Sequence, residues 1–271
     1  MVGVMTTPAP LIRPDVKTAA FFDLDNTVIQ GASIFHLGRG LYRRGFFPTR
    51  LILKGLWLQT WFRVVGRENP DHIRQARDSA LNFIAGHTVD EMAAAGEEIY
   101  EESILPKVWP GTRALAQMHL DAGQQVWVVT AAPIELATII AKRLGLSGAV
   151  ATVPETVDGV YTGRLVGELL HGPAKADAVR TLAAEHDLDL ARCFAYSDSY
   201  NDLPMLSLVG HPCAVNPDRR LERHAQEYDW QIREFRTHRK AVQLGLLSTA
   251  AAGAAAGALA AGLGVRRVFK R

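Results

Sequence analysis

Short apolar runs alternate with longer amphipathic segments along most of the chain, which predicts strands that alternate with helices. The apolar runs lie at residues 19–22, 126–129, 193–196 and 212–215. A run of this length that ends in polar residues is typical of a strand buried on both faces of a parallel sheet. Helical patterns occupy residues 113–123, 134–146, 173–188 and 201–209. We therefore expect an α/β fold built on a doubly wound parallel sheet.

Residues 33–106 interrupt this alternation with helical patterns alone, including residues 50–65 and 88–104. Because the block follows the first predicted strand directly, we interpret it as an inserted α-helical cap. The core would then comprise residues 18–32 and 107–235. The apolar positions of 51–65 go nearly all round a helix, so this segment is either buried between cap helices or placed against lipid, and we expect burial.

Turn residues mark several element boundaries. The sequence WPGT at 109–112 predicts a turn after which Thr112 caps a helix that Gly123 ends. Alternation around Gly159 and Gly163 predicts a small hairpin. Residues 1–17 contain three prolines and no apolar core long enough for a secretion signal, so we expect a flexible leader.

Composition narrows the class of protein. A chain of 271 residues with 48% hydrophobic and 21% charged residues is long and apolar enough for a globular enzyme with an insertion. Thirty Lys and Arg against 28 Asp and Glu give a net charge of +2, which gives no reason to expect nucleic acid as a partner. The two cysteines, Cys193 and Cys213, are too few for a disulfide framework. We expect them to be buried in neighbouring strands of a cytoplasmic protein.

Polar side chains stand where the predicted strands end. Asp23 and Asp25 follow the first strand, Thr130 follows the second, and Asp198 and Asp202 follow the third. Sites in open parallel sheets form beyond the carboxyl ends of the strands, so these side chains should meet at one edge. Carboxylates that close would repel one another unless a cation lay among them. A set of oxygen ligands without a His or Cys pattern favours a hard ion, and Mg²⁺ is the candidate.

Four sequence motifs occur in an order that resembles the haloacid dehalogenase superfamily of phosphatases. They are DLDNT at 23–27, Thr130 after VWVV, Lys175 in GPAKADAV, and DSYNDLPML at 198–206. The helical block after the first motif and DGVYTGRLVGE at 158–168 resemble the phosphoserine-phosphatase-like subclass. The resemblance covers about residues 17–232 and implies a Rossmann-like core with a helical cap.

The resemblance also implies a role for each motif residue. Asp23 would be the nucleophile that forms an aspartyl-phosphate, and Asp25 would be the acid and base. Thr130 and nearby amides would hold the phosphoryl oxygens, while Lys175 would offset their charge. The implied Mg²⁺ ligands are Asp23, Asp25 through its backbone carbonyl, Asp198, and Asp202 directly or through water. The implied function is Mg²⁺-dependent hydrolysis of a small organic phosphate ester.

Each of these residues could instead have a purely structural role. An aspartate at a strand end is usually a turn or helix-cap residue when it stands alone. Thr130 could cap the helix that follows Pro133, and Lys175 could be an ordinary surface lysine. Because the helix dipole disfavours a cation at the start of a helix, the position of Lys175 favours a functional role.

The substrate is less well defined than the reaction. Phosphoserine phosphatases place a glutamate shortly after the first motif and a cap arginine around the amino acid. Here Ala32 and Ser33 stand at the place of that glutamate, and the second motif reads VTAAP. We therefore expect phosphoserine to be a poor substrate. Arg74 and Arg77 could bind an anionic group or lie on an ordinary charged helix face.

Residues 236–271 form a basic and Ala/Gly-rich hydrophobic tail. The stretch 241–265 has no charged residue, and a helix of that length would span about 37 Å, enough to cross a hydrocarbon core of about 30 Å. We expect the tail to associate with a membrane, with a packed Ala-rich helix as the alternative. Two other functions therefore remain open: a membrane-associated phosphatase of lipid-like phosphates, and a regulatory protein with a retained phosphatase core.

Overall fold

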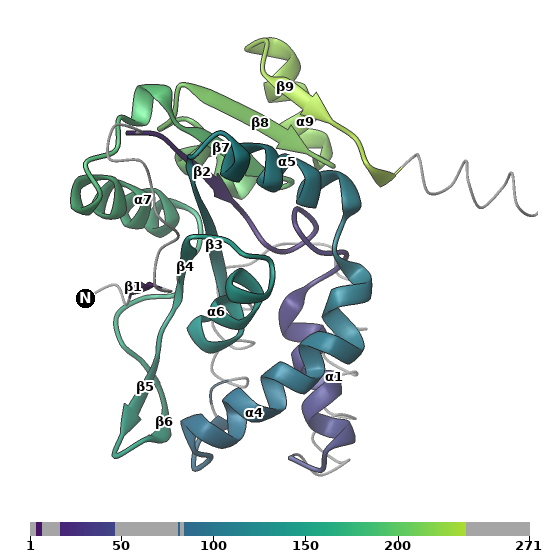
Figure 1. The fold of residues 1–271 in the computed structure, drawn as a ribbon, viewed down its shortest axis with the longest axis vertical. Coiled ribbons are helices and arrows are strands. Elements are labelled where there is room, and N and C mark those ends of the chain that lie inside the picture. The colour runs from purple at the N-terminus through teal and green to yellow at the C-terminus, as the bar shows by residue number, and fades with distance from the viewer. Residues whose placement is uncertain (1–3, 7–16, 47–80, 82–83, 237–271) are drawn as a thin grey trace, which may run out of the picture. The chain divides into compact units, whose positions relative to one another are not determined.

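The protein contains a mostly parallel sheet with seven strands, shown in Figure 1. The computed structural model describes residues 4–6, 17–46, 81 and 84–236. In spatial order the strands are β1 (Val4–Thr6), β4 (Gly148–Thr152), β3 (Gln125–Pro133), β2 (Ala19–Phe22), β7 (Phe194–Ser197), β8 (His211–Val215) and β9 (Gln231–Arg233). Only β1 runs antiparallel to its neighbour among these described strands. The predicted parallel sheet is confirmed.

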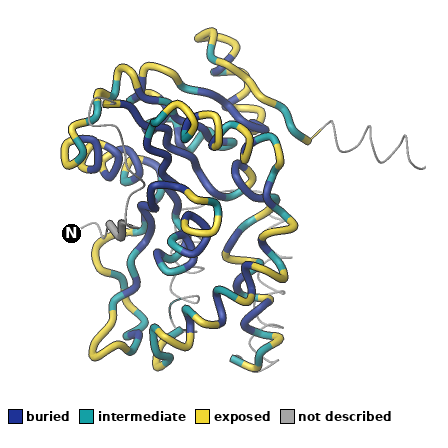
Figure 2. Tube along the Cα trace, in the orientation of Figure 1, coloured by how far each residue is buried: buried dark blue, intermediate teal, exposed yellow. Residues whose placement is uncertain are grey.

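Helices cover both faces of this sheet. Their bounds are α5 Pro110–Asp121, α6 Ile134–Arg143, α7 Pro173–Glu185, α8 Leu203–Leu206 and α9 Arg219–Glu227. Phe21 packs in a core with residues of α7, α8 and α9, whereas the next residue, Phe22, lies against His119 of α5. Successive strand residues therefore reach opposite faces, and Figure 2 shows the central strands buried. This arrangement confirms a doubly wound core.

Two described helices of the predicted cap follow β2. They are α1, Ser33–Arg43, and α4, Val89–Ile99. Thr88 and Glu91 form a capping box that begins α4. The chain then passes through a π-helical turn, Tyr100–Ile104, and a 3₁₀ turn, Leu105–Lys107, before it re-enters the core. The chain therefore leaves the core after β2 and re-enters it nearby, because Ile29 bridges Val108 and the N–H of Trp109 donates to the carbonyl of Val28 at 2.9 Å.

Ion pairs connect the cap helices to each other and to the core. Arg44 at the end of α1 contacts Glu98 and Glu102 at 2.8 and 2.9 Å. Arg143 of α6 contacts Glu97 and Glu101 at 2.5 and 3.1 Å. Because most of these side chains are partly exposed, each pair contributes little to stability, about 1 kcal/mol or less.

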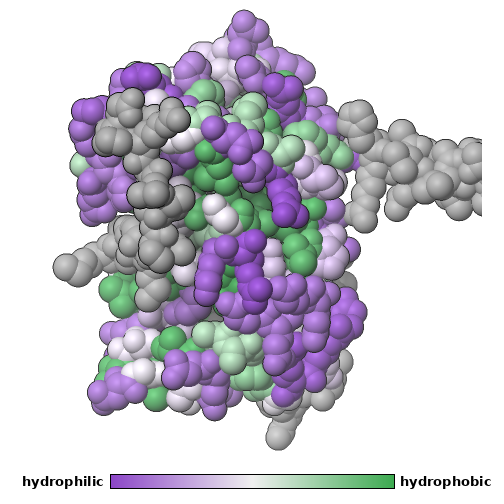
Figure 3. Space-filling view, viewed as in Figure 1, coloured by the Kyte–Doolittle hydropathy of each residue, from purple (hydrophilic) through white to green (hydrophobic). Residues whose placement is uncertain are grey.

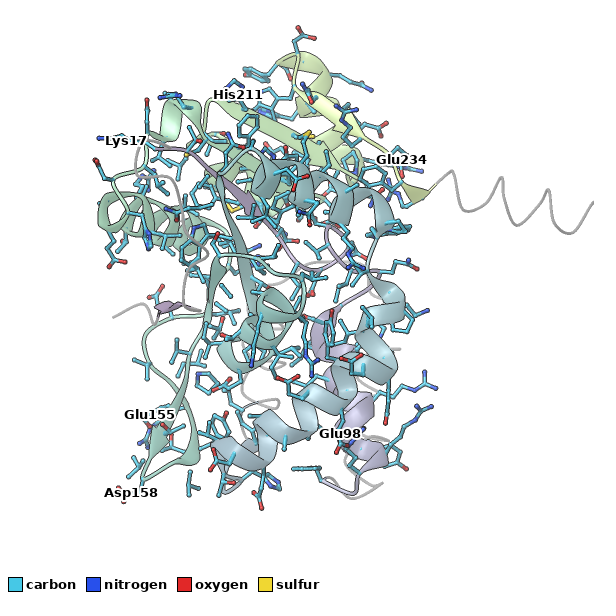
Figure 4. The ribbon with its side chains drawn as sticks, in the orientation of Figure 1. Lys17, Glu98, Glu155, Asp158, His211 and Glu234 are labelled. Atoms are coloured by element: carbon cyan, nitrogen blue, oxygen red, sulfur yellow. The ribbon has the colours of Figure 1, made fainter. Side chains whose placement is uncertain are left out.

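The predicted hairpin is confirmed as β5 (Pro154–Val157) and β6 (Val160–Leu165). Figure 4 marks it by Glu155 and Asp158 and marks α4 by Glu98. Tyr161 of β6 bonds through its backbone to the segment that leads into α4, at Gly86 and His87. Burial, and then the nearby carboxylate of Glu135 in α6, raise the pKa of its hydroxyl. The hairpin therefore contacts both the cap and the core.

Two expectations about local structure differ from what the structure shows. Thr112 lies inside α5, which begins at Pro110, and its hydroxyl donates to the carbonyl of Thr27 at 2.7 Å, so it does not cap the helix. Within the expected flexible leader, Val4–Thr6 form β1 against β4. Three residues are too short a run to signal a strand. Cys193 and Cys213 are buried, as predicted, and both are free thiols. Cys213 lies in β8, whereas Cys193 directly precedes β7.

Several expectations fall outside the described residues. These are the helix at 51–65, the arginines Arg74 and Arg77, and the hydrophobic stretch 241–265. Residues 1–233 form one compact unit and residues 234–271 a second, of which only 234–236 are described. Within the described part of the chain, every helix falls short of the length and apolar character that a membrane span requires. Membrane association through 241–265 thus remains a prediction.

Candidate active site

The first site residue follows β2 directly. The backbone N–H of Asp23 donates to the carbonyl of Tyr196 at 2.9 Å, which continues the pairing of β2 with β7. Asp23 is 6% exposed. The chain then turns back, because Asn26 adopts a positive φ of 59° and its side chain accepts from the N–H of Gly31 at 3.0 Å. In the same loop Asp25 accepts from the N–H of Ser33 at 2.8 Å, which holds its carboxylate beside the start of α1.

Lys175 lies in the first turn of α7 and is buried, with 3% exposure. Its ammonium donates to Asp23 Oδ1 at 2.5 Å and to Asp202 Oδ2 at 2.8 Å. A buried lysine needs such partners, because an unpaired charge in the interior is strongly disfavoured. The structure therefore excludes the surface-lysine reading and places Lys175 between two predicted site carboxylates.

The loop after β7 carries the other two carboxylates. Asp202 is buried, and its Oδ2 also accepts from the hydroxyl of Ser197 at 2.7 Å. The hydroxyl of Ser197 in turn accepts from the N–H of Ser199 at 3.2 Å. Asp198 is half-buried at the beginning of this loop. Two donors thus fix the orientation of Asp202.

Thr130 lies near the end of the neighbouring strand β3. Because Phe22 pairs with Val128, Thr130 extends two residues beyond that pair, next to the loop of Asp23. Its hydroxyl accepts from the N–H of Ala132 at 3.1 Å. Both residues belong to β3, and α6 begins only at Ile134, so Thr130 does not cap the helix.

Electrostatics at the site are dominated by burial and by like charges. Burial raises the pKa of Asp23 to about 8; Lys175 lowers this pKa, and Asp202, Asp25 and Asp198 raise it. Burial, followed by Asp202, raises the pKa of Asp198 to about 7. Burial favours a lower pKa for Lys175, but Asp23 and Asp202 outweigh it, so its pKa is above the usual value. One ammonium therefore does not balance the carboxylates around it.

The donor set fits a hard divalent cation. The metal ligands that the described residues offer here are carboxylate, carbonyl and hydroxyl oxygens, which Mg²⁺ prefers. A cation would lower the raised pKa values of Asp23 and Asp198. Within residues 17–46 and 84–236, however, no three His, Cys, Asp or Glu side chains are already arranged as a metal site. In the same part of the structure the ammonium of Lys175 contacts one carboxylate oxygen of Asp23 and one of Asp202.

An apolar hollow elsewhere on the molecule has a different character. It is lined by Phe22, Val28, Thr112, Arg113, Ala116, Gln117, Leu144 and Leu146. Figure 3 shows apolar residues gathered near the middle of the displayed face. None of the predicted site residues lines the hollow, so we do not assign the substrate to it.

Sequence reasoning missed two residues that contact the site loops. Asn216 donates from its side chain to the carbonyl of Asn26 at 3.2 Å. The carboxylate of Asp218 accepts from the N–H of Tyr200 at 2.8 Å. Their sequence position could have indicated them, because the turn NPD follows the predicted strand PCAV and should lie at the same edge of the sheet as the site loops.

Comparisons with known proteins show the family to which the chain belongs. The model of the haloacid dehalogenase-like hydrolase family matches residues 20–207. The chain is similar to phosphoserine phosphatase SerB1 of Mycobacterium tuberculosis, with 58% identity over 91% of this chain and 80% of the relative. It is 31% identical to a histidinol-phosphatase of Neisseria meningitidis, over 82% of this chain and 100% of the relative.

A solved structure shares the fold. It is a protein of unknown function from Bordetella pertussis, with a TM-score of 0.72 and 31% identity over 81% of this chain and 99% of that one. The family match covers most of the compact unit and all of the predicted motifs that carry Asp23, Thr130, Lys175 and Asp202. The chain therefore belongs to the haloacid dehalogenase-like hydrolases, as a phosphatase of that family.

Proposed function

We propose that the protein is a Mg²⁺-dependent phosphomonoester hydrolase that acts through an aspartyl-phosphate on Asp23. The observation that carries this proposal is the buried contact of Lys175 with Asp23 Oδ1 and Asp202 Oδ2. This contact holds one oxygen of Asp23 and leaves the other to attack. A buried carboxylate fixed in this way suits an in-line nucleophile.

The proposed reaction has two steps. Asp23 forms a bond to phosphorus while the bond to the ester oxygen breaks, and Asp25 gives its proton to that leaving oxygen. Asp25 then takes a proton from water, which attacks phosphorus, releases phosphate and restores the Asp23 carboxylate. Thr130 and neighbouring amides would hold the phosphoryl oxygens, and Lys175 would offset their negative charge.

Mg²⁺ would add electrostatic stabilisation of the transferred phosphoryl group. We assign its binding to Asp23, to the backbone carbonyl of Asp25, and to Asp198. Asp202 would contribute through its Oδ1 or through water, because its Oδ2 already accepts from Lys175 and Ser197. This division gives Asp202 a second task, which is to orient Lys175.

The substrate is proposed to be a small organic phosphate ester, encountered in the cytoplasm. The names of the relatives favour phosphoserine or histidinol phosphate as compounds to test. The local sequence favours a substrate other than phosphoserine, because Ala32 and Ser33 offer no charge to an ammonium group. A lost hydrogen bond to a charged group costs about 1.5–3 kcal/mol, or about one to two decades in specificity.

A panel of phosphomonoesters tests the proposal. It should include phosphoserine, histidinol phosphate, sugar phosphates and a lysolipid phosphate, each assayed with Mg²⁺ and with EDTA. We expect Mg²⁺-dependent phosphate release that Asp23→Asn abolishes. Asp158→Asn is the matched control, because Asp158 is exposed at the hairpin tip in a conformation that Asn also adopts.

Two results would count against parts of the proposal. Equal release in EDTA would remove the metal requirement. A kcat/KM that ranks phosphoserine first would refute our reading of Ala32 and would support the substrate named for the mycobacterial relative. A lysolipid phosphate as the best substrate would instead support the membrane-associated alternative.

A further inference from the structure

The turn Asn216–Asp218 lies between β8 and α9, at the same edge of the sheet as the site loops. Strand β8, which begins at His211 (labelled in Figure 4), pairs in parallel with β7, and Ser197 pairs with Ala214. The turn therefore leaves the sheet beside the loop that carries Asp198 and Asp202. Neither Asn216 nor Asp218 has a role in the proposed chemical steps.

Asp218 makes more contacts than a helix cap requires. Its Oδ1 accepts from the N–H groups of Arg220 and Leu221, both at 2.8 Å, and these two bonds cap α9. Its second oxygen, Oδ2, accepts from the N–H of Tyr200 at 2.8 Å. Its own N–H donates to the carbonyl of Asp198 at 2.7 Å. One residue thus contacts both ends of the segment 198–200.

Asn216 makes the equivalent contact to the other site loop. It is 2% exposed and adopts a positive φ of 48°, a conformation that asparagine tolerates better than most residues. Its side-chain amide donates to the carbonyl of Asn26 at 3.2 Å, within the loop that follows Asp23. Its N–H donates to the carbonyl of Arg233, the last residue of β9. The turn is therefore anchored to the edge of the sheet and to the nucleophile loop.

We infer that Asn216 and Asp218 are positioning residues that hold the Asp23 loop and the Asp198 loop in a fixed relation. That these residues hold the two loops follows from the hydrogen bonds alone. That they matter for catalysis rests on the proposed function. The two loops belong to β2 and β7, and each gains a hydrogen bond from this third segment. Partners that orient metal-binding residues typically change metal affinity or activity by about 10–100-fold when they are removed.

Asp218→Ser separates the two tasks of Asp218. Serine caps helices about as well as aspartate, but its single oxygen does not serve α9 and Tyr200 together. The matched control is Asp189→Ser, because Asp189 is also an exposed N-cap aspartate, which accepts from the N–H of Ala191 at 3.1 Å. Asn216→Gly removes the side chain but keeps access to a positive φ.

Hydrogen exchange without metal is the first measurement. We expect Asp218→Ser to speed exchange of the amide of Tyr200 about tenfold or more, while helix α9 keeps its protection. Asn216→Gly should speed exchange in peptide 24–31, and Asp189→Ser should leave both regions unchanged. The inference would be overturned if the amide of Tyr200 in Asp218→Ser and peptide 24–31 in Asn216→Gly both exchanged at the wild-type rate. This result would count against it whatever substrate the enzyme hydrolyses.

The second measurement is the Mg²⁺ concentration that gives half of the metal-induced rise in Tm. We expect Asp218→Ser to raise this concentration about 10–100-fold relative to wild type and to Asp189→Ser. An unchanged midpoint would overturn the role of Asp218 at the metal loop. If wild type itself showed no rise in Tm, the Mg²⁺ part of the proposed function would fail, and the exchange data would still decide the positioning role.

Discussion

Lys175→Met should destabilise the protein although the side chain keeps a similar length. Lys175 is 3% exposed and bonds to Asp23 and Asp202, which are 6% and 2% exposed. Removing one partner of a buried ion pair costs about 3–5 kcal/mol, because the other charge stays buried without compensation. Proton uptake by one of the two carboxylates limits this cost, so we expect a loss of about 3 kcal/mol in the free energy of unfolding at pH 7.5.

Urea unfolding in EDTA measures this loss without any contribution from bound metal. The double variant Lys175→Met, Asp202→Asn should unfold at a higher urea concentration than Lys175→Met alone, since it removes one of the two unpaired carboxylates. Lys142→Met is the control, because Lys142 is exposed on α6 and should change stability by less than about 0.5 kcal/mol. A loss below about 1 kcal/mol in Lys175→Met, or no recovery in the double variant, would refute the ion-pair reasoning.

Three further changes have defined outcomes. Asp25→Asn should still release nitrophenol from p-nitrophenyl phosphate in a single burst, because a good leaving group needs little protonation; equal loss on activated and unactivated esters would contradict the acid role. His119 hydrogen-bonds to Tyr196 at 2.8 Å, and burial lowers the pKa of its imidazole. As the pH falls below about 6.5, this imidazole therefore takes up a proton in the unfolded chain before it does so in the folded protein. The unfolding free energy of wild type should therefore fall more than that of His119→Gln between pH 7.5 and pH 5.5. If the difference between the two proteins were the same at both pH values, this role of His119 would be excluded. Ending the chain at Arg236 should release an active phosphatase from the membrane fraction; a full-length protein found only in the supernatant at low salt would refute the anchor.

Much of the site was predictable because strand ends can be read from local pattern. Asp23 follows AAFF and Asp198 follows FAYS, and parallel strands bring their carboxyl ends to one edge. The rule needs no knowledge of side-chain contacts, and in the structure Asp23 and Asp198 do follow the ends of β2 and β7. The same rule applied to PCAV would have drawn attention to Asn216 and Asp218.

Contacts between distant residues were not predictable from local pattern. Lys175 and Asp23 are 152 positions apart, and nothing near either residue specifies a bond between their side chains. Thr112 was expected to cap α5 because its residue type favours caps. In the structure Pro110 starts the helix earlier, and the hydroxyl of Thr112 finds the carbonyl of Thr27 instead. Tertiary packing thus decided between two local possibilities.

Rapid acid quenching during turnover of a ³²P-labelled phosphomonoester tests the central claim most directly. The account predicts that wild-type protein and Asp158→Asn retain acid-stable, base-labile label in the peptide that contains Asp23. It also predicts that Asp23→Asn retains none and does not turn over, while its Tm stays close to that of wild type. Near-normal turnover by Asp23→Asn, or label on a peptide that lacks residue 23, would contradict the covalent mechanism.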